Sequence, residues 1–324
     1  MKTTVQTPES SDDRLRFITY LNYISAIAKF LSEQYPEPST LCRAVISSPA
    51  FNQIQGGKCS DSPKLQKLLR NSWFTEIQLN MASAYPDFIV YSNHWAPVQL
   101  YYAVYLSIRS FLLAGGHQAH GDHTSTLTAI AEQIRLRHDL FPQPWKTLCH
   151  GNPEDHACTY TGLPPSVTPQ AISSLSSAHY VDFWNSYTMF LRTTRKRSLE
   201  KKCEDWKQKH KKKRVSPSAK KQFLNKLSPT SIFDGMYRLR IRSNYADVDA
   251  FLLTLDMDTE AKLLNEAIRT IGWYSALLFE LLTARYLGKS QFRNIVQGFT
   301  QHDKEGRSAT LLSARWKAIE QAWK

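Results

Sequence analysis

The sequence predicts an all-α fold on three observations. Apolar residues recur at helical spacing over several long stretches, the 15 prolines lie mostly between those stretches, and no series of alternating strands is present. Hydrophobic residues make up 42% and aromatic residues 12% of the 324 positions. This composition is typical of a globular chain with a sizeable buried core and excludes a chain that is disordered throughout.

Helical periodicity and end signals place the elements along the chain. Pro97 suits the first turn of a helix, and Gly115 and Gly116 suit its end. The short run 87–94 is β-prone and could be extended, whereas 142–169 and 216–229 suit irregular chain. The expected helices are 13–35, 40–48, 63–81, 95–114, 124–140, 169–192, 198–213, 258–287 and 308–323.

The stretch Tyr237–Leu253, YRLRIRSNYADVDAFLL, is the segment around which the chain is expected to be organised. It follows a basic segment and restarts the apolar pattern. We expect it to pack against Trp95–Ala114, a stretch that is apolar almost all round and should therefore lie centrally. Tyr101–Leu112 and Leu263–Leu282 should then share one helical core.

The formal net charge of +13 is concentrated in one segment. Arg192–Lys226 contains 15 Lys and Arg and 3 Asp and Glu, a net charge of +12, so the rest of the chain is nearly neutral. We therefore divide the chain into a first part of a bundle, 1–140, a loop-rich and basic insertion, 141–230, and a second part of the bundle, 231–324.

The basic segment is a candidate nucleic-acid interface. Lysine and arginine displace counterions from a phosphate backbone, and a tryptophan can stack on bases. The alternative is a solvated charged helix without a ligand. The candidate binding residues are Arg195, Lys196, Arg197, Lys201, Lys202, Trp206, Lys211, Lys212, Lys213 and Arg214.

Two stretches together resemble the HEPN superfamily of helical bundles. One is WAPVQLYYAVYLSIRSFLLAGG followed by DHTSTLTAI, and the other is YRLRIRSNYADVDAFL. The resemblance implies an up-and-down helical bundle with the basic segment as a helical insertion. It also implies a place among the RNA-binding or RNA-cleaving proteins of prokaryotic defence and toxin–antitoxin systems.

Many HEPN proteins are metal-independent ribonucleases with an arginine followed by a histidine after about four to six residues. The arginine would stabilise the phosphorane charge, and the histidine would move a proton. This sequence departs from that motif, because Asp247 stands five residues after Arg242. The resemblance therefore implies a divergent site in which Arg242 acts with Tyr245, Asp247 or His123, of which His123 would take the place of the motif histidine. The alternative is a helix cap with local salt bridges.

The histidines and cysteines offer weaker candidates for metal binding. His117, His120, Asp122 and His123 form HxxHxDH, and Cys149, His150, His156 and Cys158 lie close together, but neither has a standard zinc spacing. In the first group, we favour Asp122 as a helix cap and His123 packed on the bundle. We therefore predict no metal. We also predict no cofactor, since no Gly-rich phosphate loop is present.

The remaining features bear on partners and location. Five widely spaced cysteines without CxxC indicate reduced thiols and a cytoplasmic protein, and no apolar stretch predicts a membrane span. The expected partner is a nucleic acid, with RNA favoured, and the second candidate is a protein partner or homodimer. The alternatives to nucleic-acid binding are a divergent ribonuclease and a non-catalytic interaction subunit that docks a partner through Trp316 and Trp323.

Overall fold

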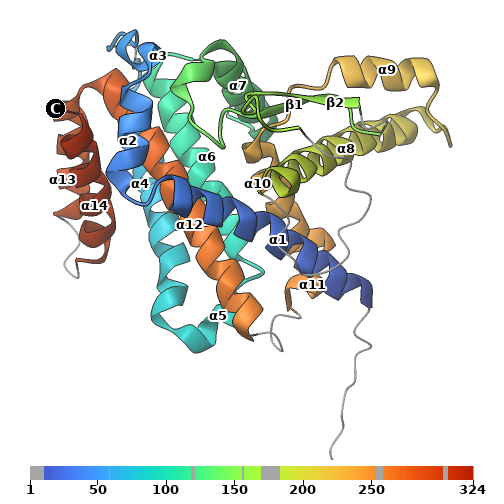
Figure 1. The fold of residues 1–324 in the computed structure, drawn as a ribbon, viewed down its shortest axis with the longest axis horizontal. Coiled ribbons are helices and arrows are strands. Elements are labelled where there is room, and N and C mark those ends of the chain that lie inside the picture. The colour runs from blue at the N-terminus through green and yellow to red at the C-terminus, as the bar shows by residue number, and fades with distance from the viewer. Residues whose placement is uncertain are drawn as a thin grey trace, which may run out of the picture.

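The computed structural model describes residues 11–57, 59–117, 121–154, 157–168, 183–252, 258–301 and 306–323. Within these residues the chain is mostly helical. The one sheet in the described part pairs β1 (Leu148–Asn152) with β2 (Ala157–Thr161) in antiparallel register. The predicted all-α class is confirmed (Figure 1).

The core is built on α6 (Ala96–Ala114) and α12 (Asp258–Leu287), as the sequence predicted. These helices pack against each other, with α4 (Ser62–Met81) on α6 and α1 (Ser11–Gln34) on α12. The rings of Phe111 and Phe279 meet at a centroid distance of 5.7 Å. The two helices come close at Gly272, where an added Cβ would lie 3.2 Å from Leu100 Cδ1.

The expected organising stretch spans three consecutive helical elements. These are α10 (Ile232–Ile241), the π-helical turn η4 (Arg242–Ala246) and α11 (Val248–Leu252). Before α10, Asp234 Oδ2 accepts hydrogen bonds from the amide and the hydroxyl of Ser231, at 2.8 and 2.7 Å. The predicted packing of α10 on α6 is confirmed.

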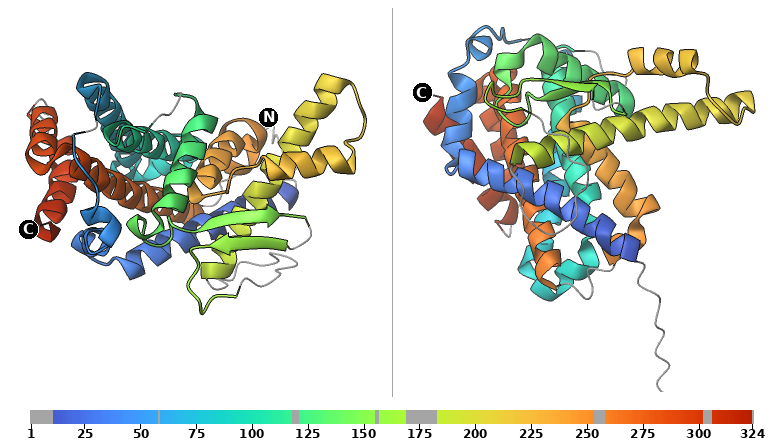
Figure 2. Two further views of the ribbon diagram at one scale, coloured as in Figure 1. Left: turned by 90° about the horizontal axis from the view of Figure 1, so that it is seen from above. Right: turned by 45° about the vertical axis from the view of Figure 1, so that its right-hand side comes forward.

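The middle of the chain contains more regular structure than its sequence indicated. The run expected to be irregular forms β1 and β2, and α9 (Pro217–Asn225) occupies the segment expected to be a linker. A single helix, α8 (Phe183–His210), carries the first part of the basic segment 192–226. Its first turns pack on α1 and β1, whereas its second half and α9 project from the body as an antiparallel pair (Figure 2).

The run 87–94 is not extended, which corrects the sequence expectation. It forms η2 (Pro86–Phe88) and α5 (Ile89–Ser92), and the next residue, Asn93, is buried and donates to the Ala261 carbonyl at 2.8 Å. This tertiary contact outweighs the local β-propensity.

The other elements complete the bundle, with α13 and α14 beside α2 at one end (Figure 1). Among the helices of the described part of the chain, none is long and apolar enough to cross a membrane. The remaining elements are α2 (Pro38–Ile46), α3 (Pro49–Asn52), η1 (Ala82–Ala84), α7 (His123–Leu136), η3 (His138–Leu140), α13 (Lys289–Thr300) and α14 (Arg307–Ala322).

Candidate nucleic-acid interface

The projecting helical pair presents most of the positive charge to solvent. We call residues 196–226 the basic arm, which contains 13 Lys and Arg and 3 Asp and Glu. Of the predicted binding residues, eight are exposed cations on this arm: Lys196, Arg197, Lys201, Lys202, Lys211, Lys212, Lys213 and Arg214. The last four form the turn that follows α8, where Lys211 has a φ of 50° and the chain reverses toward α9.

Arg195 does not belong to this exposed set, which corrects the sequence expectation. Arg195 is 3% exposed. Its Nε donates to the Gly151 carbonyl at 2.7 Å, and its Nη1 donates to the Ser228 carbonyl at 2.8 Å. Burial lowers the pKa of its guanidinium. Arg195 therefore anchors α8 to β1 and to the segment after α9, and it cannot reach a phosphate in solvent.

Trp206 lies on the arm with a partner of its own. Its ring stacks on that of His210, one helical turn away, at a centroid distance of 4.5 Å and an interplanar angle of 24°. The residue is half-buried, so the stacked pair is accessible from the arm surface. One face of the indole is covered by His210.

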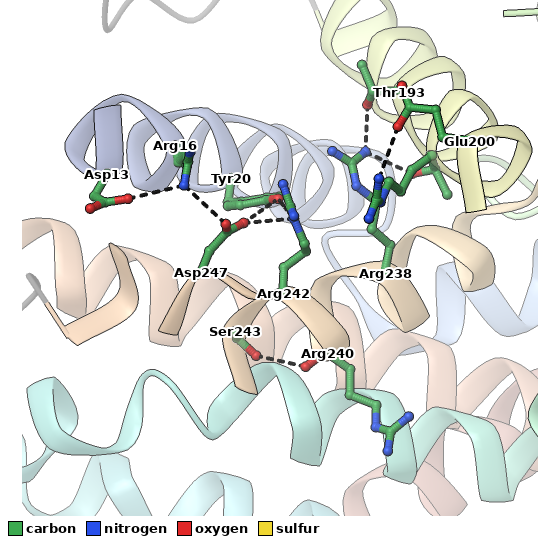
Figure 3. Close-up of polar contacts among 12 residues, drawn as sticks. Asp13, Arg16, Tyr20, Thr193, Glu200, Arg238, Arg240, Arg242, Ser243 and Asp247 are labelled. Atoms are coloured by element: carbon green, nitrogen blue, oxygen red, sulfur yellow. Dashed lines mark hydrogen bonds and ion pairs between the residues drawn. The ribbon is translucent and has the colours of Figure 1, made fainter. Parts of the chain in front are cut away.

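The predicted catalytic residues Arg242 and Asp247 meet in an ion pair beside α1. Asp247 is 4% exposed and lies 2.8 Å from Arg242 Nε, and its carboxylate also accepts from the Tyr20 hydroxyl at 3.2 Å. Arg16 lies on the other side of the same carboxylate at 3.5 Å (Figure 3). The amide of Asp247 donates to the Arg242 carbonyl at 2.8 Å, which closes the π-helical turn. This arrangement fits a structural clamp between η4 and α1.

Tyr245 is not part of that clamp. It is 69% exposed at the end of η4. The structure therefore brings together two of the four predicted catalytic residues, Arg242 and Asp247, and leaves Tyr245 in solvent.

His123 lies in a different cluster, among the tyrosines of α6 and α10. Its Nδ1 shares a hydrogen bond of 2.8 Å with the Tyr101 hydroxyl, and its ring packs at 4.7 Å from Tyr105 and 5.4 Å from Tyr237. Asp122 caps α7 by accepting from the Ser125 amide at 2.9 Å. The favoured interpretation of these two residues, a cap and a packed histidine, is confirmed.

The arginine of the His123 cluster is Arg240, which the sequence interpretation did not select. Its guanidinium donates to the Tyr102 hydroxyl at 3.0 Å and lies 5.7 Å from the centroid of Tyr237. Figure 3 shows Arg240 pointing away from Arg238 and Arg242. Burial and then the charge of Arg240 lower the pKa of His123. The sequence signal for this cluster was the i, i+1, i+4 spacing of Tyr101, Tyr102 and Tyr105, which places three tyrosines near one another on α6.

The histidine and cysteine groups place no metal site in the described residues. His120 and His156 lie outside those residues, and no set of three or more His, Cys, Asp and Glu within them could hold a metal ion. His117 lies 3.4 Å from the Tyr286 hydroxyl. Cys149 and Cys158 are free thiols on the paired strands.

The tryptophans offered as a docking face are packed against the body. Trp316 contacts Phe292 at a centroid distance of 5.8 Å, and Trp323 contacts Phe51 at 5.5 Å. Both residues are half-buried, so these contacts weaken the case for a protein partner at this face.

Comparisons with known proteins add no family to this geometry. No family model, curated protein or solved structure matches the chain.

Proposed function

We propose that the protein binds nucleic acid through the basic arm, with the helical bundle as a rigid scaffold. RNA is the class that the HEPN resemblance implies. The supporting observation is the concentration of charge on an element that projects from the body. Thirteen Lys and Arg stand against three acidic residues in 196–226, while the rest of the chain is close to neutral.

The way in which the arm is held also supports this proposal. The buried guanidinium of Arg195 joins α8 to β1, and Arg192 Nε donates to the Pro153 carbonyl at 3.0 Å. A backbone-binding element gains from being fixed before the ligand arrives, because less conformational entropy is lost on binding.

The test reverses charge in the exposed turn without touching the anchor. The triple variant Lys211→Glu, Lys212→Glu, Lys213→Glu should bind RNA at least about tenfold more weakly, and its salt dependence should fall by about 2 in log–log slope. Fluorescence anisotropy at about 50 and 200 mM salt measures both quantities.

A matched triple variant on α4 is the control. Lys64, Lys67 and Arg70 are exposed on α4, a helix that lies far from α8 and α9 in Figure 1, and their reversal to Glu changes the net charge by the same amount. Equal losses in the two triple variants would contradict a site on the arm. Binding to anionic vesicles but not to RNA would replace the nucleic acid with a membrane surface as the partner.

The His123 cluster favours a second candidate function, metal-independent cleavage of RNA. A histidine whose pKa is lowered is neutral near pH 7 and can accept the proton of a ribose hydroxyl, while Arg240 supplies positive charge nearby. RNA cleavage that survives a chelator and is lost in His123→Gln would support this function. Cleavage that is unchanged in His123→Gln and Arg240→Gln would exclude this cluster, and loss in Arg242→Ala alone would assign it to the η4 site.

A further inference from the structure

A groove lined by both charged and apolar side chains lies at the base of the basic arm, between α8 and the α10–η4 segment. Its volume of about 300 Å³ is that of a small ligand pocket. One wall comes from α8 and carries Arg197 and Lys201, and the other carries Arg238 and Arg242. Residues that are about 40 positions apart in sequence thus place four cations around one space.

Three of these four cations, Arg197, Lys201 and Arg242, retain capacity for an anionic ligand. Arg197 is paired only at the surface, with Glu200 and Glu204 at 3.3 and 3.4 Å, and such pairs contribute about 0–1 kcal/mol. Arg242 uses its Nε for Tyr20 and Asp247, and its two terminal nitrogens make no hydrogen bond to the described residues. Lys201 is exposed. A phosphate could therefore be bound without dismantling the fold.

The groove also carries two carboxylates and an amide. Glu204, Asp205 and Gln208 line it from α8 and offer hydrogen-bond acceptors. The amino groups of nucleobases are donors that carboxylates and amides recognise. These acids would repel a plain polyanion, so the lining suits a ligand with a phosphate at one end and donors at the other.

An aromatic residue, Tyr237, is among those that line the groove on the α10 side. It is held in place because it packs against Tyr101 and His123 at centroid distances of 5.3 and 5.4 Å. A fixed aromatic side chain supports an unstacked base at little entropic cost.

We propose that this groove holds one nucleotide of a single-stranded nucleic acid whose backbone continues along the basic arm. The inference rests on the proposed function and deepens it by naming the strand state. A duplex keeps its bases paired and stacked, so it can contact the arm but cannot insert a base without unpairing. A single strand should therefore bind more tightly than a duplex of equal length.

The experiment fills the groove while every charge on the arm is kept. Ser198 lies half-buried in the groove wall, and its hydroxyl donates to the Thr194 carbonyl at 3.1 Å. Ser198→Trp should raise the dissociation constant for a single-stranded RNA at least about tenfold, the loss expected from one base stack. The dissociation constant of the same variant for duplex RNA should not change. Ser313→Trp, on the exposed surface of α14 and outside the basic arm, is the matched control and should alter neither.

Ultraviolet cross-linking of the unmodified protein gives an independent readout. Single-stranded RNA should cross-link to a peptide that contains Tyr237 as well as to the arm. Single-strand binding by Ser198→Trp at the wild-type level, or cross-links confined to 196–226, would overturn the groove assignment while leaving the arm intact. The Lys211–Lys213 reversal tests only whether the arm binds RNA, so its result bears on the proposed function and not on the groove.

A free nucleoside monophosphate presents the same chemistry and is tested beside the strand. Saturable binding of a monophosphate that Ser198→Trp abolishes, together with equal affinity for single strand and duplex, would assign the groove to a free nucleotide and overturn the strand proposal.

Discussion

Arg315 and Glu280 form a two-pronged ion pair inside the bundle, with Nε and Nη2 of the arginine each 2.8 Å from a carboxylate oxygen of the glutamate. The side chains are 0% and 3% exposed. A third member, Glu76, accepts from Nη1 at 2.6 Å, and Trp73 Nε1 donates to Glu280 at 2.8 Å. This network ties α14 to α12 and α4.

Removal of the arginine from this network should destabilise the fold strongly. Arg315→Met leaves two buried carboxyl groups without their cation, and we expect a loss of about 3–5 kcal/mol in the free energy of unfolding. Urea denaturation measures it. The control is Arg293→Met, whose partner Glu320 lies at the surface, with an expected loss of about 1 kcal/mol or less. Equal losses in the free energy of unfolding would show that the buried ion pair contributes no more to stability than the surface pair.

Glu76 should make the stability depend on pH. Burial raises its pKa above the ordinary value of 4.5, since Arg315 only partly compensates for the lost solvation. The protonated Glu76 carboxyl group contributes to the free energy of unfolding. This contribution is fully present below pH 4.5 and declines as the pH rises through the higher folded-state pKa. Glu76→Gln should therefore gain stability relative to the wild type as the pH rises. Parallel curves of unfolding free energy against pH would contradict this expectation.

Two glycines on helices should respond oppositely to alanine. An added Cβ at Gly235 would lie 2.2 Å from Phe190 Cε1, so Gly235→Ala should cost about 1–3 kcal/mol by overpacking. At Gly298, inside α13, nothing lies within 4 Å of an added Cβ. Gly298→Ala should therefore stabilise the protein by up to about 1 kcal/mol through helix propensity. Thermal unfolding distinguishes the two.

Arg195 should control the attachment of the basic arm. Arg195→Met removes the donors to Gly151 and Ser228, and limited proteolysis should then cut within 196–226 sooner than in the wild type. Lys196→Met changes the exposed neighbour and should leave the cleavage rate as it is. Faster cutting in both variants would attribute the effect to charge and not to the anchor.

Local sequence signals were sufficient where a helix depends mainly on its own pattern. Pro97 and Gly115 bound α6 as expected, and the apolar periodicity of α12 identified a core helix. They failed at 87–94, where the β-prone run is helical because Asn93 reaches the Ala261 carbonyl of α12. They also missed α9, whose cap, a Ser216 hydroxyl that accepts from the Ala219 amide at 3.2 Å, lies within a polar stretch.

The candidate site divides in the same way. The exposed cations of the arm followed from charge density, which needs no partner to be recognised. Arg195 could not be separated from Lys196 in sequence, because its carbonyl acceptors lie 44 and 33 positions away. In the same way, His123 lies with Arg240 and not with Arg242, where the HEPN resemblance would have placed it, since side chains two residues apart on a helix point to different sides.

The amino-acid order alone determined that the chain is helical, that α6 and α12 are core helices, and that one segment carries the charge, because periodicity and composition are local properties. Tertiary structure decided which arginines are buried and which line the groove. It also decided that α8 and α10 meet to form the groove. Those outcomes depend on distant backbone carbonyls, carboxylates and aromatic rings, which sequence distance does not encode.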